Sequence, residues 1–74
     1  PISIGEFLRS LNGQLTDTQR NRISSALYQC VYAGQLKSFN RGQGQTYTFN
    51  PDDLAKFAKD YFNDRNIKVK GINS

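Results

Sequence analysis

Hydrophobic residues recur with a helical period near the start of the chain. The first stripe has the spacing i, i+3, i+4, i+7 and consists of Ile4, Phe7, Leu8 and Leu11. Ser3 and Glu6 form a capping-box pattern around its start, and Asn12-Gly13 is typical of a helix end. The pattern therefore predicts a first helix over residues 4–12.

A second helical stripe follows after a short polar segment. Its apolar members are Ile23, Ala26, Leu27, Cys30 and Val31. A cap is available from Thr16 together with Gln19, or from Asp17 alone. We predict a second helix over residues 17–33. Only residues 13–16 separate the two predicted helices, and so tight a connection indicates a helix-turn-helix.

The hydrophobic period changes in the middle of the chain. Residues 36–39 and 45–49 are rich in β-branched and aromatic side chains. The segment Asn40-Arg41-Gly42-Gln43-Gly44 lies between them, and its two glycines can adopt positive φ. This pattern predicts a β-hairpin with a loop at that segment.

A third helix is predicted after the hairpin. In Asn50-Pro51-Asp52-Asp53 the asparagine can cap, the proline fits the first helical position, and the two acids face the positive end of the helix dipole. The apolar stripe that follows consists of Leu54, Phe57, Ala58, Tyr61 and Phe62. The helix is expected over residues 51–63.

Residues 65–74, where lysines alternate with Ile67 and Val69, are expected to form a short strand or a flexible basic tail.

Composition narrows the possible functions of this 74-residue chain. Its length predicts one domain over residues 1–74, and 36% apolar residues suffice for one small core. The net charge of +4 and the pI of 9.5 point toward a polyanionic partner. Residues 1–49 carry a net charge of +3, and the four acids of residues 50–74 fall in the predicted third helix or, for Asp64, directly after it.

Several classes of function are disfavoured by what the sequence lacks. There is no histidine, and the single cysteine, Cys30, permits no internal disulfide. A binding surface is easier to build at this size than a supported catalytic pocket, so we expect neither an enzyme nor a cofactor or metal. No secretory signal pattern or long apolar run is present, and we expect a cytoplasmic, nucleoid-associated protein that does not enter a membrane.

The outer face of the predicted second helix carries side chains that can form hydrogen bonds, and none of them is acidic. Its members are Thr18, Asn21, Arg22, Ser25, Tyr28, Gln29 and Tyr32. Arginine can pair with guanine, asparagine and glutamine with adenine, and hydroxyls can reach phosphate. An ordinary solvated face usually mixes both signs of charge, whereas no acid follows Asp17 in this helix. The face therefore favours DNA contact, with Arg20 on its flank directed to a backbone phosphate.

Two further segments supply candidate DNA contacts. The predicted hairpin loop carries Arg41 and Gln43, with Lys37 beside it. Its glycines would let the backbone approach a phosphate or a minor groove, although a plain turn that needs its glycines is an alternative explanation. In the tail, Lys68 and Lys70 are expected to contact phosphates.

The order of these elements resembles the small winged helix of phage excisionases and of the MerR-type DNA-binding domain. Three segments of this sequence carry the resemblance, which covers residues 3–62: Ala33-Gly34-Gln35-Leu36, residues 41–49, and Asp52-Asp53-Leu54-Ala55-Lys56-Phe57. The predicted second helix is longer than in the short excisionase domains and is equally typical of a general winged-helix recognition helix.

The resemblance implies an α+β fold and a mode of DNA binding. In those families the second helix enters the major groove, and the wing contacts the adjacent minor groove or backbone. Carried over by position, this implicates Thr18, Asn21, Arg22, Ser25 and Arg41.

We therefore expect a winged-helix protein that binds double-stranded DNA, as a transcription regulator or a recombination directionality factor of a phage or mobile element. The full set of expected DNA-binding residues is Thr18, Arg20, Asn21, Arg22, Ser25, Tyr28, Gln29, Lys37, Arg41, Gln43, Lys68 and Lys70. Two alternatives stay open: a protein-interaction module or inhibitor, and binding of RNA or single strands through stacked tyrosines. A homodimer or a protein partner is compatible with each.

Overall fold

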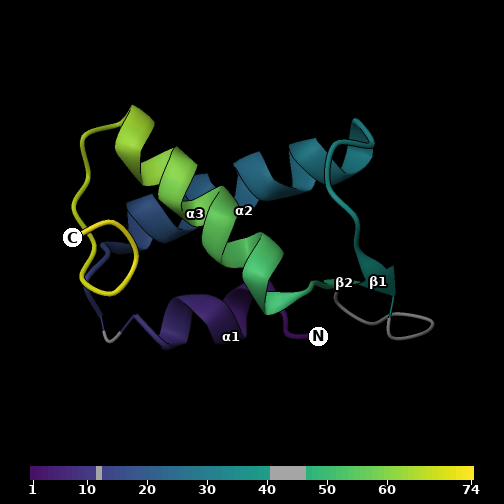
Figure 1. Ribbon diagram of the computed structural model, residues 1–74, viewed down its shortest axis with the longest axis horizontal. Coiled ribbons are helices and arrows are strands. Elements are labelled where there is room, and N and C mark those ends of the chain that lie inside the picture. The colour runs from purple at the N-terminus through teal and green to yellow at the C-terminus, as the bar shows by residue number, and fades with distance from the viewer. Residues whose placement is uncertain (12, 41–46) are drawn as a thin grey trace.

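The computed structural model describes residues 1–11, 13–40 and 47–74. In chain order its elements are α1 (Ile4–Arg9), α2 (Asp17–Tyr32), β1 (Phe39–Asn40), β2 (Tyr47–Thr48) and α3 (Pro51–Asp64). These described elements make a small, helix-rich α+β fold. In Figure 1, α3 crosses α2, α1 lies below both, and the strands and the C-terminus lie at opposite ends.

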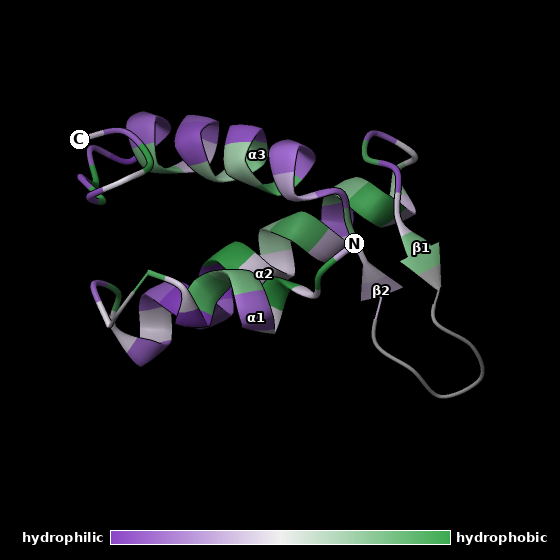
Figure 2. Ribbon diagram, turned by 60° about the horizontal axis from the view of Figure 1, so that its bottom comes forward, coloured by the Kyte–Doolittle hydropathy of each residue, from purple (hydrophilic) through white to green (hydrophobic). Residues whose placement is uncertain are grey.

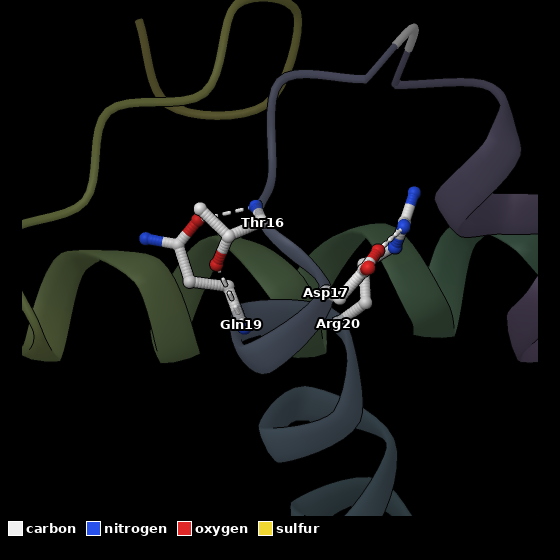
Figure 3. Close-up of polar contacts among 4 residues, drawn as sticks. All are labelled: Thr16, Asp17, Gln19 and Arg20. Atoms are coloured by element: carbon white, nitrogen blue, oxygen red, sulfur yellow. Dashed lines mark hydrogen bonds and ion pairs between the residues drawn. The ribbon is translucent and has the colours of Figure 1, made fainter.

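The helices begin where the caps predicted. Thr16 and Gln19 form the reciprocal capping box, with Gln19 N–H donating to Thr16 Oγ1 at 3.1 Å and Thr16 N–H donating to Gln19 Oε1 at 2.9 Å. Figure 3 shows this box on one side of the start of α2 and the Asp17–Arg20 ion pair on the other. Asn50 Oδ1 accepts from Asp52 N–H at 2.8 Å and caps α3.

The first helix is shorter than expected, because the chain tightens after Arg9. Ser10 N–H donates to Phe7 O at 3.1 Å, and Leu11 N–H donates to Leu8 O at 3.2 Å. These i→i+3 bonds end the α-helix, but Leu11 stays buried on the same side of the molecule. The predicted end at residue 12 was therefore wrong, and the connection to α2 is longer than residues 13–16.

The ends of α2 and α3 match the prediction to within one residue. After Tyr32, Gly34 adopts a φ of 75°. Its N–H donates to Val31 O at 3.0 Å, and Gln35 N–H donates to Cys30 O at 2.9 Å. This pair of bonds closes the last turn and directs the chain away from the helix.

Within the described residues, the strands are shorter than the pattern predicted. β1 and β2 pair antiparallel, with Phe39 opposite Thr48, and Thr48 Oγ1 donates to Phe39 O at 3.0 Å. Residues 36–38 are not part of the ladder, and Leu36 packs against the edge of the core. After β2, Phe49 exchanges two backbone hydrogen bonds with Ile2, at 2.8 and 2.9 Å. The predicted loop residues Arg41 to Gly44 lie outside the described residues.

The core receives side chains from all three helices and from the segments around them. Figure 2 shows the hydrophilic side of α3 turned outward, away from α1 and α2. The most deeply buried large side chains are Ile23, Leu27, Phe49, Leu54, Phe62 and Val69. From the predicted stripe of α2 only Ile23 and Leu27 are fully buried, whereas Ala26, Cys30 and Val31 lie half-buried at its border.

The expected strand does not form in residues 65–74. Turns lie at residues 65–66 and 70–73, and between them Val69 has 0% exposure in the core. Asn73 holds the turn: its Oδ1 accepts from Val69 N–H at 2.8 Å, and its Nδ2 donates to Ile67 O at 2.8 Å and to Asn63 Oδ1 at 2.7 Å. A buried valine and a bonded asparagine side chain make this segment part of the fold.

Candidate nucleic-acid interface

Most of the predicted outer face of α2 is exposed and borders a single groove. The groove has a volume of 510 Å³ and lies between α2 and the end of α3. It is lined by Thr18, Asn21, Arg22, Ser25, Ala26, Gln29, Tyr61 and Arg65. Five of the expected DNA-binding side chains are therefore brought together on one surface, and each of the five is exposed.

The groove carries positive charge from both of its sides. Arg22 approaches from α2 and Arg65 from the C-terminal cap of α3, and among the described residues no Asp or Glu lines it. Within the described residues, the single ion pair joins Arg20 to Asp17, so neither Arg22 nor Arg65 is part of an ion pair there. Two unneutralised cations beside hydroxyl and amide groups form a surface suited to a polyanion.

Sequence reasoning missed Tyr61 and Arg65 as members of this surface. Tyr61 was assigned to the core stripe of the third helix, and Arg65 to the tail. In the structure the Arg65 guanidinium lies 3.8 Å from the centroid of the Tyr61 ring, a cation–π contact. The spacing i, i+4 of these two residues was the available signal, because it places them one turn apart on a helix.

Arg20 lies apart from the groove. It is two residues from Arg22, which separates the two side chains by about 160° around the helix axis. Its guanidinium instead pairs with Asp17 near the loop that precedes α2 (Figure 3). Any phosphate contact of Arg20 would therefore lie on a different side of the helix from the groove.

Tyr28 borders the polar face but packs on the strands. Its ring centroid lies 6.1 Å from that of Tyr47 on β2 and 6.4 Å from that of Tyr32. Tyr28 is half-buried, whereas Tyr32 is 75% exposed. The β1–β2 pair thus lies along one flank of the polar face of α2, and the end of α3 lies along the other.

Lys37, a further predicted contact, does not line the groove. Lys37 Nζ is 5.3 Å from the Phe39 ring centroid, and Lys37 borders a second hollow together with Asp53 and Asp60. Arg41 and Gln43 lie outside the described residues.

Both tail lysines, Lys68 and Lys70, are exposed. The backbone of Lys70 is hydrogen-bonded to the side chain of Gln14, shortly before the start of α2. The tail cations are therefore placed near the N-terminal end of the helix whose polar face lines the groove.

Comparison with protein-family models, with curated proteins and with solved structures finds no match to this chain. In the part of the chain that the structure describes, no helix is long and apolar enough to cross a membrane. Among the same residues, no group of three or more acidic, cysteine or histidine side chains is positioned to hold a metal ion.

Proposed function

We propose that the chain binds double-stranded DNA as a winged-helix domain. The exposed side of α2 enters the major groove, and a β-hairpin wing formed around β1 and β2 meets the adjacent minor groove or backbone. In this role the protein regulates transcription or the direction of a recombination reaction.

One observation carries the proposal: five side chains expected to read or contact DNA remain exposed and border one acid-free groove. A helix of the length of α2, 16 residues, spans about 24 Å. The major groove is about 12 Å wide and admits an α-helix. Asn21, Arg22 and Gln29 are the side chains able to make paired hydrogen bonds to base edges.

The placement of the strands also supports the proposal. Tyr28 on α2 contacts Tyr47 on β2, so the strands flank the polar face and do not cover it. A loop extending from β1 and β2 would therefore start beside the helix that is proposed to read the bases. This placement of the strands beside α2 supports the proposed winged-helix arrangement.

Fluorescence anisotropy with labelled duplexes tests the proposal. Affinity should fall steeply between about 50 and 200 mM salt, because bound cations release counterions from DNA. Arg22→Ala and Asn21→Ala should each weaken binding to a selected sequence by about tenfold and relax its sequence preference.

Arg9→Ala is the matched control for Arg22→Ala. It removes the same charge from an exposed position on α1, away from the groove. Absence of duplex binding at low salt, or equal losses for Arg9→Ala and Arg22→Ala on every sequence, would exclude α2 as the reading helix.

A second candidate is a protein-interaction module. Its support is the exposure of two aromatic side chains, 75% for Tyr32 and 41% for Phe39. Binding of a protein partner through these rings would be insensitive to salt and lost in Tyr32→Ala, whereas Arg22→Ala would leave it unchanged.

A further inference from the structure

The Arg65 guanidinium contacts the ring of Tyr61, and this contact favours one orientation of the cation. Tyr61 is 7% exposed, and its ring packs edge-on against Phe62 with a centroid distance of 5.8 Å and stacks on Phe57 at 6.1 Å. A fixed ring limits the conformations of the cation above it. Arg65 therefore projects into the groove as an oriented group, with less freedom than an ordinary surface arginine.

The groove presents donors from both of its walls. Arg65 lies on the α3 side, and Thr18 and Ser25 add hydroxyl groups from the α2 side. A guanidinium offers several N–H donors in a planar fork, which matches the oxygens of a phosphate. Because no carboxylate lines the groove, its donors are available to an anion.

We propose that this groove holds a backbone phosphate of bound DNA, with Arg65 as its oriented donor. This inference rests on the proposed function and deepens it. The contact fixes the depth and register of α2 in the major groove, while Asn21 and Arg22 face the bases. Arg65 therefore contributes affinity for every sequence and does not select among them.

Duplex binding by Arg65 variants tests this role. Arg65→Ala should lower affinity about tenfold on preferred and unrelated sequences alike, as expected for loss of a charge-assisted hydrogen-bonding group. The slope of log affinity against log salt should become less steep by about one. Arg65→Lys should restore the slope but only part of the affinity, because it keeps the charge and loses the planar fork.

A second measurement separates this inference from the proposed function. Inorganic pyrophosphate is titrated into the full chain while the arginine Nε–Hε resonances are followed by NMR. The Arg65 resonance should shift, and that of Arg9 should not. Thermal melting of each variant verifies that it is folded.

Each result decides one of the two claims. If the wild-type chain binds duplex DNA but Arg65→Ala has the wild-type affinity and salt slope, the phosphate role is overturned and DNA binding stands. If duplexes do not bind but pyrophosphate shifts the Arg65 resonance, DNA binding fails and the anion site stands. If the chain does not bind duplexes and pyrophosphate does not shift the Arg65 resonance, both claims are wrong.

Discussion

Gln14 and Lys70 are 56 positions apart, and the side-chain amide of the first pairs with the backbone of the second. Gln14 Oε1 accepts from Lys70 N–H at 2.7 Å, and Gln14 Nε2 donates to Lys70 O at 3.1 Å. The two bonds tie the C-terminal segment to the connection between α1 and α2. They place the tail cations beside the start of the helix that is proposed to bind DNA.

Gln14→Ala is expected to loosen this attachment. Two hydrogen bonds at an exposed site together contribute about 1 kcal/mol, so the midpoint of thermal unfolding should fall by about 5 °C for a domain of this size. Circular dichroism melting measures the change. Gln35→Ala is the control, because Gln35 is exposed and only its backbone makes a hydrogen bond in the described structure. Identical melting of the two variants would contradict a role for the Gln14 side chain.

Val69→Ala is expected to destabilise the fold more strongly. Val69 has 0% exposure, and removal of its two methyl groups costs about 2 kcal/mol in lost burial and cavity formation. The unfolding midpoint should fall by about 10 °C. Lys68→Ala, at the exposed neighbouring position, should change the midpoint little. If the tail unfolds independently of the core, the unfolding midpoint of Val69→Ala should instead be close to that of the wild type.

Tyr28 and Tyr32 should differ in their effect on stability although both were placed on one polar face. Tyr28→Ala removes contacts with Tyr47 and should cost about 2 kcal/mol. Tyr32 is 75% exposed, so Tyr32→Ala should change the free energy of unfolding by less than about 0.5 kcal/mol. Urea unfolding of both variants distinguishes them, and equal effects would show that Tyr28 does not hold the strands to α2.

Lys68 and Lys70 should contribute affinity for DNA without sequence preference. Each alanine variant is expected to lower the affinity for preferred and random duplexes by the same factor. The slope of log affinity against log salt should become less steep by about one. The matched control is Lys59→Ala, an exposed lysine on α3 that lines neither of the two hollows. A change in sequence preference for either tail variant would assign it a base contact instead.

Local signals in the sequence located the helices well. Capping by Thr16, Asn50 and Ser3 acts within three residues of each helix start, so the starts of all three described helices could be predicted from neighbours alone. The end of α1 was wrong because Leu11 continues the apolar spacing although the backbone has already tightened into i→i+3 bonds. Hydrophobic spacing reports which side chains are buried, and several backbone conformations can bury the same set.

The members of the candidate site were only partly predictable. The polar face of α2 follows from helical periodicity, which is a property of consecutive residues. The wall opposite to it, with Tyr61 and Arg65, depends on how α3 crosses α2, and no pattern within either helix specifies that angle. For the same reason Lys37 was grouped with residues that the fold places elsewhere. The position of Arg20 away from the groove, in contrast, already follows from helical periodicity.

By itself, the sequence determined where helices begin, which stripe of each is buried, and that the outer side of α2 lacks acids, because these depend on spacing and side-chain chemistry along the chain. Only the tertiary structure decided that the tail completes the core through Val69 and that Arg65 faces Arg22 across a groove. Both arrangements arise from contacts between segments far apart in sequence. Their energies depend on the packed shape of the whole domain and not on local periodicity.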